Sequence, residues 1–150
     1  MNKTKLEFRN YKVSNYEECL ELFEANCPAY FAVEEREDYR EFLKSINDQY
    51  FLGYVNGSLM CCFGITNHSK GLSSLSWIMV RPSQHKKGYG HQMMSHFFDN
   101  IQDQSLGKVL IATSQHANKF FEKYGAEQLE FIEDGWGKGM HKINMEIVFP

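Results

Sequence analysis

The sequence of 150 residues lacks a long hydrophobic run and an excess of positive charge. No apolar segment approaches the ~20 residues that a membrane-spanning helix needs, and the amino-terminal MNKTKLEFRN holds no apolar signal core. The formal net charge of −3 offers no extended basic surface to a nucleic acid. We therefore expect a cytoplasmic protein that binds neither a membrane nor a nucleic acid.

Cysteine is also scarce, and its spacing excludes the common metal and redox motifs. The four cysteines, Cys19, Cys27, Cys61 and Cys62, contain no CxxC pair. Cys61 and Cys62 are neighbours in a strand-like segment, so their side chains should point to opposite faces of a sheet. The spacing of four histidines also does not match a metal-ligand motif: His68, His91, His96 and His141. We expect buried free thiols in a reducing compartment and no bound metal.

What the chain does contain is enough apolar material for a folded core. Hydrophobic residues make up 43% of the sequence and aromatic residues 15%, which argues against disorder. The sequence shows no repeat, low-complexity tract or linker. A chain of this length is expected to form a single domain over residues 1–150.

The first half of the chain predicts one strand, two helices and a hairpin. Apolar residues at positions 6, 8 and 11 suggest a strand, and Ser14–Glu17 (SNYE) fits a capping box in which Ser14 caps a helix. Helical spacing of apolar residues follows over 16–23 and again over 35–46. Two strand-like segments, QYFLGYV and SLMCCFGIT, flank Asn56-Gly57, which is a strong signal for a tight hairpin.

The second half predicts strands that alternate with helices. Two strands are expected at residues 72–80 and at KVLIATS (108–114), and the second is of the kind buried on both faces. Two more strands are expected at 126–133 and 141–149, joined by a glycine-rich DGWGKG loop. Helices are expected over 89–103 and near 117–124, the second ending at Gly125. The order β-α-α-β-β-β-α-β-α-β-β predicts an α/β (α+β) fold with a single mixed, mostly antiparallel, twisted sheet of about seven strands and four helices.

The segment HKKGYG, His85–Gly90, lies between an expected strand and an expected helix. A helix start offers free N–H groups and the positive end of the helix dipole. Glycine at positions 88 and 90 removes Cβ atoms that would keep a phosphate away, and Lys86 and Lys87 add positive charge. The segment favours a pyrophosphate-binding loop, although an ordinary turn with solvated lysines would look similar.

Two other phosphate-binding motifs fit poorly. A Walker A loop ends in Gly-Lys-Ser/Thr, which is missing, and a dinucleotide fingerprint needs a glycine where Met93 stands.

The same segment resembles the Gln/Arg-x-x-Gly-x-Gly/Ala signature of the GNAT acetyltransferase superfamily, with His85 in place of Gln or Arg. The preceding WIMVRPSQ resembles the family's strand-Val-x-Pro approach to this loop, and FFEKYGA resembles its Tyr-Glu-Lys-x-Gly-Phe segment, with Gly125 matched. The expected order of elements is also the family's order. The resemblance implies a sheet splayed between its fourth and fifth strands, often with a bulge in the fourth, and an acyl-CoA site in the gap.

The resemblance also implies which residues bind CoA. The pantetheine arm would bond the backbone of the fourth strand at Ile78 and Val80, and the Val80 N–H would stabilise an oxyanion. Ser114 stands where many relatives have a CoA-contacting Asn, and it is a second catalytic candidate; Asn118 is one helical turn further on. Phe121 stands where relatives often have a Tyr that protonates the thiolate, which Phe cannot do. The full implied cofactor set is Ile78, Met79, Val80, His85, Lys86, Lys87, Gly88, Tyr89, Gly90, His91, Ser114, Asn118 and Phe121.

The acceptor pocket, by the same resemblance, would be bordered by Tyr30 and Phe31 and by Trp136, which we expect to be an exposed and mobile binding lip. Trp77 fits core packing and pocket lining equally well. These aromatic residues could instead form a homodimer contact.

No general base can be identified from the sequence. A carboxylate run near the expected acceptor loop fits a solvated surface: Glu34, Glu35 and Glu37. His116 could approach the thioester, but a lone histidine more often has no such role.

The leading prediction is an acyl-CoA-dependent N-acetyltransferase. It would move the acetyl group of acetyl-CoA to a primary amine of a small molecule, protein or peptide, by direct attack in a ternary complex. A non-catalytic acyl-CoA-binding module and a nucleotide-binding regulator are the alternatives.

Overall fold

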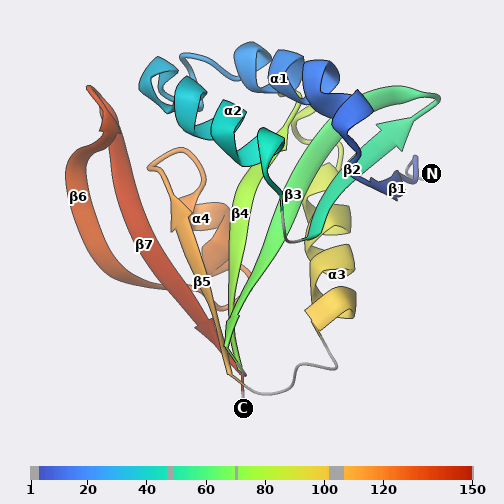
Figure 1. Ribbon diagram of the computed structural model, residues 1–150. Coiled ribbons are helices and arrows are strands. Elements are labelled where there is room, and N and C mark those ends of the chain that lie inside the picture. The colour runs from blue at the N-terminus through green and yellow to red at the C-terminus, as the bar shows by residue number, and fades with distance from the viewer. Residues whose placement is uncertain (1–3, 47–48, 70, 102–106, 150) are drawn as a thin grey trace.

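The computed structural model describes residues 4–46, 49–69, 71–101 and 107–149. They form one seven-stranded sheet with helices on both faces (Figure 1). Its strands are β1 (Glu7–Asn10), β2 (Gln49–Val55), β3 (Ser58–Ser69), β4 (Leu72–Val80), β5 (Lys108–Thr113), β6 (Glu127–Gly137) and β7 (Met140–Val148). The spatial order is β1-β2-β3-β4-β5-β7-β6, with β4 and β5 parallel and the other neighbours antiparallel. The predicted mixed, mostly antiparallel sheet is confirmed.

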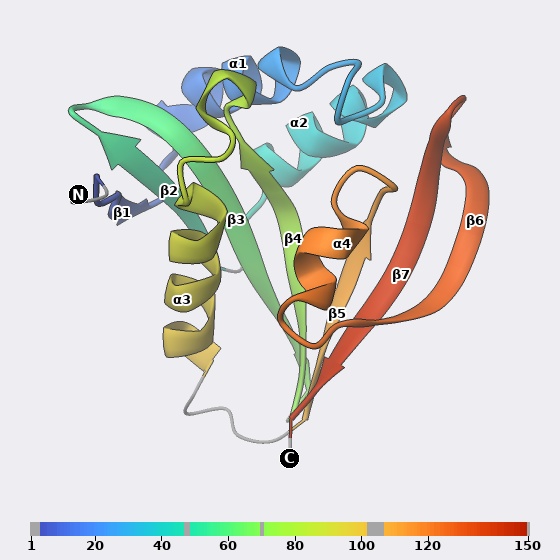
Figure 2. The same ribbon diagram turned by 180° about the vertical axis from the view of Figure 1, so that it is seen from behind.

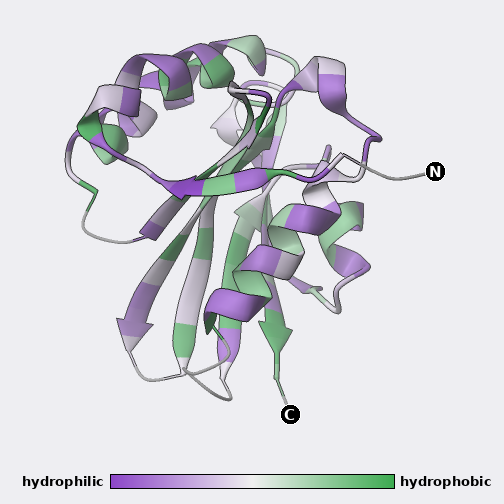
Figure 3. Ribbon diagram, turned by 90° about the vertical axis from the view of Figure 1, so that its right-hand side faces the viewer, coloured by the Kyte–Doolittle hydropathy of each residue, from purple (hydrophilic) through white to green (hydrophobic). Residues whose placement is uncertain are grey.

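The helices cover the two faces of the sheet in pairs. They are α1 (Tyr16–Ala25), α2 (Arg36–Lys44), α3 (Tyr89–Ile101) and α4 (Asn118–Glu122), with 3₁₀ turns η1 (Val13–Asn15), η2 (Val33–Glu35) and η3 (Pro82–Gln84). Helices α1 and α2 lie on one face, and α3 and α4 lie on the other (Figures 1 and 2). Hydrophilic and hydrophobic residues alternate along these elements (Figure 3), as expected where one side of each faces a core. The last residues predicted for the third helix, 102–103, lie outside the described residues.

Each face of the sheet therefore has its own hydrophobic core. Met93, Phe97 and Phe121 belong to the core under α3 and α4, whereas Phe23 and Tyr39 belong to the core under α1 and α2. The adjacent cysteines confirm the predicted alternation, since Cys61 lies in the first core and Cys62 in the second. All four cysteines are free thiols.

Three local predictions are wrong. Ser14 does not cap a helix but lies within η1, where the Lys12 N–H donates to Asn15 Oδ1 (2.8 Å). Strand β5 is buried on one face only: Val109 and Ile111 are in the core, while Ala112 is exposed. DGWGKG is not a loop, because β6 continues to Gly137 and only two residues separate it from β7.

The β4–β5 pair separates part of the way along. Pairing covers only Leu72–Leu75 with Lys108–Ile111, and beyond Leu75 the two strands diverge, as Figure 1 shows. In β4 the register with β3 shifts between the pairs Gly64↔Ser76 and Cys62↔Met79, and Trp77 has a φ of +47°. This is a β-bulge, which bends a strand and adds twist. The predicted splay and bulge are both confirmed.

No helix within the described ranges is long and apolar enough to cross a membrane.

Candidate active site

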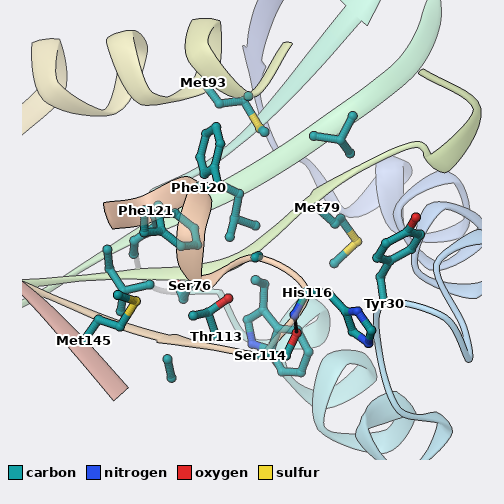
Figure 4. A pocket seen from close by; sticks show the side chains of 18 of the residues that line it. Tyr30, Ser76, Met79, Met93, Thr113, Ser114, His116, Phe120, Phe121 and Met145 are labelled. Carbon is teal, nitrogen blue, oxygen red and sulfur yellow. Dashed lines mark hydrogen bonds between the residues drawn. The ribbon is translucent and has the colours of Figure 1, made fainter. Parts of the chain in front are cut away.

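A cavity of about 910 Å³ fills the gap between β4 and β5. Its lining includes Met93 and Phe121 from the α3/α4 core and also Met79 and Trp77 from the α1/α2 side. The cavity therefore passes through the sheet and is reached from both faces. Figure 4 shows this extent, with Phe120 and Phe121 grouped away from Tyr30 and His116. Two molecules entering from opposite faces could meet inside it.

The free edge of β4 points into this gap. The Arg81 N–H donates to Met60 O on β3 (2.7 Å). Because the N–H groups of an extended strand alternate between its two edges, the Val80 and Ile78 N–H groups face the side from which β5 has diverged. Ile78 and Val80 both line the cavity, so the expected backbone contacts with a pantetheine arm are geometrically available.

The bulge in β4 is held by a buried hydroxyl. Tyr50 Oη on β2 lies 2.9 Å from Trp77 O and donates to this carbonyl, which the bulge turns out of the ladder. Tyr50 Oη also contacts Tyr39 Oη (2.9 Å) and Cys62 Sγ (2.9 Å). The burial of Tyr50 raises the pKa of its hydroxyl, so the group stays protonated and can donate.

The glycine-rich segment forms a turn beside the cavity, directly before a helix whose first N–H groups have no partner within the helix. Lys86 and Gly88 both have left-handed backbone, with φ of +68° and +83°, and α3 begins directly afterwards at Tyr89. A turn of this kind at a helix start is a concave anion site. Gly88, Gly90 and Lys86 line the cavity, as do His85, Tyr89 and His91. The loop thus has the geometry expected of a phosphate site.

Gly90 is small for a different reason from the one that the sequence suggested. A Cβ at position 90 would lie 2.9 Å from ring atoms of Phe120 on α4. The missing side chain makes room for packing of α4 against α3. Gly88, with its positive φ, is the glycine that the loop conformation requires.

Residues around α4 complete this side of the cavity. Phe121 lines it and is only 1% exposed, and its ring packs against Phe120 (centroids 5.2 Å apart). Ser114 also lines it, and its hydroxyl accepts a hydrogen bond from the His116 N–H (3.2 Å). Tyr124 is not part of the lining; it packs at the core edge and hydrogen-bonds His91 Nδ1.

Two expected cofactor residues are not part of the lining. Lys87 is exposed, and Asn118 lies at the start of α4 without lining the cavity. The role that the resemblance implied for each of them stays a prediction.

The other end of the cavity is aromatic, and we call it the acceptor side: Asn26, Tyr30, Phe31, Glu35, Trp77 and Trp136. Phe31 stacks on Trp77 (centroids 6.3 Å apart), whose ring reaches this face because of the bulge. Tyr30 packs edge-on against His85 (4.8 Å) and His116 (5.8 Å), which follow β4 and β5. All four predicted acceptor aromatics thus line one cavity. The alternative that they form a homodimer contact stays a prediction.

Trp136 is fixed rather than mobile. It lies within β6, is half-buried, and its Nε1–H donates to Thr113 O (2.9 Å). The Lys142 ammonium lies over its ring, 4.9 Å from the centroid. The sequence-based expectation of a mobile exposed tryptophan is wrong, because strand pairing continues past the glycines.

Glu35 is the site residue that sequence reasoning missed. Only 5% of it is exposed, it lines the cavity, and its Oε2 accepts the Ala32 N–H (2.9 Å). Burial raises the pKa of this carboxyl group to about 7. The interpretation as a solvated charge run holds for Glu34 and Glu37, which are exposed, and fails for Glu35. A signal was present: positions 35, 39 and 43 have helical spacing, and Tyr39 and Leu43 are buried.

His116 lines the cavity but is exposed. In the described part of the chain no group of three or more His, Cys, Asp or Glu side chains could hold a metal ion.

A sheet that splits at the parallel pair β4–β5, with the turn at Gly88 beside the split, is the arrangement that the resemblance to acetyltransferases implied. The family comparison gives the same result. A family described as "Acetyltransferase (GNAT) domain" matches residues 15–149, and the chain belongs to this family. It is an N-acetyltransferase by family.

Many solved structures match this fold, and the following three do so at low sequence identity. Ard1 from Thermoplasma volcanium has a TM-score of 0.79 at 13% identity, covering 97% of this chain and 99% of that one. The ribosomal-protein-S18-alanine N-acetyltransferase from Escherichia coli has a TM-score of 0.78 at 11% identity, covering 95% and 93%. An aminoglycoside 6'-N-acetyltransferase complexed with coenzyme A has a TM-score of 0.75 at 12% identity, covering 96% and 98%. A comparison with proteins of curated function finds no match.

Proposed function

We propose that this protein transfers the acetyl group of acetyl-CoA to a primary amine, by direct attack of the amine on the thioester while both substrates are bound. The observation that carries the proposal is the single cavity that passes through the sheet. It joins the anion-binding turn at Gly88 to the aromatic acceptor side.

Acetyl-CoA fits the α3/α4 side of the cavity. The N–H groups of the turn and of the first residues of α3 suit its pyrophosphate, and Lys86 adds positive charge there. The free N–H groups of Ile78 and Val80 suit the amides of its pantetheine arm, and His85, Tyr89, His91 and Ser114 border the same space. Lys87 and Asn118 do not line the cavity, and the proposed site does not include them.

Bound acetyl-CoA supplies an activated acyl group as a thioester. The Val80 N–H, which points into the gap, is the group placed to donate to the oxygen that becomes negative when the amine adds. Such a donor contributes about 3 kcal/mol in other acyl transfers. Phe121 cannot protonate the departing thiolate, but a thiol has a pKa of about 8.5, so this proton can come from water.

The acceptor cannot be carried over from the structural neighbours. Their names point to chemically different amines, on an aminoglycoside and on a ribosomal protein alanine, and the identity is 12% and 11%. The common element is an amine, and that is the part the proposal adopts.

Acceptor-dependent release of free thiol tests the proposed function. The protein is mixed with acetyl-CoA and individual amines, and calorimetry separately measures CoA, ATP and NAD binding. We expect CoA binding and acceptor-dependent thiol release. CoA binding without turnover for any amine would favour the non-catalytic module, and preference for ATP or NAD would favour a nucleotide-binding regulator.

A further inference from the structure

We propose that the acceptor is a primary amine with one positive charge and an apolar body, and that Glu35 binds its ammonium group and removes a proton from it. This inference rests on the proposed function and adds to it both the class of substrate and the base that the sequence did not reveal.

The carboxylate of Glu35 has one oxygen engaged and one available. Oε2 accepts the Ala32 N–H, and Oε1 accepts no hydrogen bond from any residue that the structure describes. Within the described chain, Ser76 Oγ is the only fully covered side-chain N or O atom without a hydrogen-bond partner. Glu35 Oε1 has no partner either, so it is not fully covered, and the residue that carries it lines the cavity. An ammonium group bound in the cavity could therefore contact the Glu35 carboxylate, which is largely shielded from bulk water.

Glu35 lines the same cavity as the four aromatic residues of the acceptor side. Phe31 and Trp77 are stacked, Tyr30 stands at the entrance with 37% exposure, and Trp136 is fixed by its bond to Thr113. Aromatic faces attract cations and bury apolar groups. The acceptor side therefore suits an ammonium group attached to an apolar or aromatic body.

The distribution of charge limits the acceptor to one positive charge. Of the described residues that line the cavity, only Glu35 and Glu130 are acidic. Glu130 is exposed and already accepts a hydrogen bond from Asn144 Nδ2 (2.9 Å). A polyamine or aminoglycoside would bring further ammonium groups into an aromatic space without carboxylates to receive them, which costs desolvation energy.

The proposed step balances as follows. The Glu35 carboxylate takes a proton from the ammonium group, leaving a neutral amine with a lone pair. The amine nitrogen forms a bond to the thioester carbon, and the oxyanion that results accepts the Val80 N–H. The carbon–sulfur bond then breaks, the nitrogen loses its second proton, and the thiolate is protonated. Glu35 finally returns its proton to water, so the products are an amide, free CoA and one proton.

The charged neighbours leave the Glu35 carboxyl able to act near neutral pH. Burial is the main cause of its raised pKa; Asp38 and Glu34 add to it, while the Ala32 N–H and Lys142 on β7 oppose it. His85 and His116 also line the cavity, and both pack against Tyr30 on the acceptor side.

A structural role for Glu35 alone makes a different prediction. Its bond to the Ala32 N–H resembles half of a capping box at η2. The variant Glu35→Gln keeps an oxygen to accept that bond but cannot hold or remove a proton. Glu34→Gln is the matched control, because Glu34 precedes it in the same turn, is exposed and does not line the cavity.

The first experiment compares acceptors with the unaltered protein. Initial rates are measured with acetyl-CoA and 2-phenylethylamine, n-hexylamine, spermine or kanamycin. We expect kcat/KM to be at least about tenfold higher for the two monoamines. Faster turnover of spermine or kanamycin would overturn the inference but leave the proposed function intact, whereas a failure to bind CoA would overturn the proposed function itself.

The second experiment uses the variants with the best monoamine. Glu35→Gln should lower kcat/KM by about 10²-fold or more, with unchanged CoA affinity, and Glu34→Gln should be close to the unaltered protein. The log of kcat/KM should rise with pH through about 7 in the unaltered protein and lose this step in Glu35→Gln. A folded Glu35→Gln protein with full CoA affinity and an unchanged rate and pH profile would assign Glu35 to the turn alone.

Discussion

Glu35 is buried although ionised carboxylates strongly prefer water. Its pKa is raised from 4.5 to about 7, which means that the folded protein holds this proton more tightly than the unfolded chain. The free energy of unfolding is therefore highest below pH 4.5 as far as this group is concerned, and it falls as the pH rises from 4.5 to about 7. Keeping an ionised Glu35 in this place is a cost that catalysis would justify.

The first prediction concerns this fall in the free energy of unfolding with rising pH. Glu35→Gln removes this titration. The difference in free energy of unfolding between Glu35→Gln and the unaltered protein should therefore shift in favour of the variant, by up to roughly 3 kcal/mol, as the pH rises from 5 to 8. Urea unfolding at the two pH values measures the difference, with Glu34→Gln as the control. An identical pH dependence in the unaltered protein and Glu35→Gln would show that Glu35 has an ordinary pKa.

Phe121 is the second residue whose position matters, because it is buried and lines the cavity. Phe121→Tyr adds one hydroxyl that can protonate the thiolate, and we expect a rate increase of less than about 10²-fold, since a thiolate leaves readily. Phe121→Ala should instead lose about 3–5 kcal/mol of stability by leaving a cavity in the core. Steady-state rates with one acceptor, CoA affinities and urea unfolding separate the two effects. A Phe121→Ala protein with unaltered rate, affinity and stability would contradict the match of FFEKYGA to the family segment.

At the scale of elements, the turn before α3 depends on a left-handed residue at position 88. Gly88→Ala should cost about 1–2 kcal/mol of stability because its φ is +83°, and it should also weaken CoA binding by about tenfold or more as the N–H groups move. Gly57 in the β2–β3 hairpin has a φ of +82° and does not line the cavity. Gly57→Ala should therefore show a similar loss of stability with unchanged CoA affinity. Equal CoA affinity in both variants, measured by calorimetry, would remove the turn from the cofactor site.

The bulge of β4 makes a separate prediction through Tyr50. Tyr50→Phe leaves Trp77 O without its buried donor, which should cost about 1–3 kcal/mol of stability and weaken acetyl-CoA binding by disturbing the β4 edge. Tyr39→Phe is the control, because it keeps the ring that packs on Trp77 and removes a hydroxyl whose hydrogen bonds are to Tyr50 and Cys62, not to Trp77 O. Urea unfolding and calorimetry measure both effects. If Tyr39→Phe weakened CoA binding as much as Tyr50→Phe, the hydrogen bond to the bulge would not be what shapes the edge.

For the whole molecule, a net charge of −3 opposes binding of an anionic cofactor, so the local cations should matter. Lys86 is exposed and lines the cavity, whereas Lys87 is exposed and does not. Lys86→Ala should weaken CoA binding by about 1 kcal/mol, and Lys87→Ala by less. CoA affinity should also fall as salt concentration rises, because exposed charges are screened. If CoA affinity did not depend on salt, and if replacing both lysines by alanine left it unchanged, neither lysine would contribute to CoA binding.

Much of this architecture could be predicted because its signals are local. The Asn56-Gly57 turn places β2 against β3, apolar periodicity gives the helices, and the order of elements limits the sheet to a mixed one. The turn at Gly88 could also be located, since glycine and lysine before a helix are readable without knowing what lies opposite. Where these local signals were misread, as at Ser14 and at DGWGKG, the chain extended or began an element within a few residues of the expected place.

The sequence by itself thus determined the elements, their order, the family and the position of the glycine-containing turn before α3. Only the tertiary structure decided which side chains reach the cavity. The bulge shifts the alternation of β4 and turns Trp77 to the α1/α2 face, the packing of Phe120 explains Gly90, and the pairing of β6 with β7 fixes Trp136. Glu35 is buried because η2, directly before α2, places it on the same side as the buried Tyr39, and η2 packs against β6, which is far away in the chain. The physical reason is that backbone preferences act over a few neighbouring residues, whereas burial and the direction of a side chain depend on partners that only the folded sheet brings together.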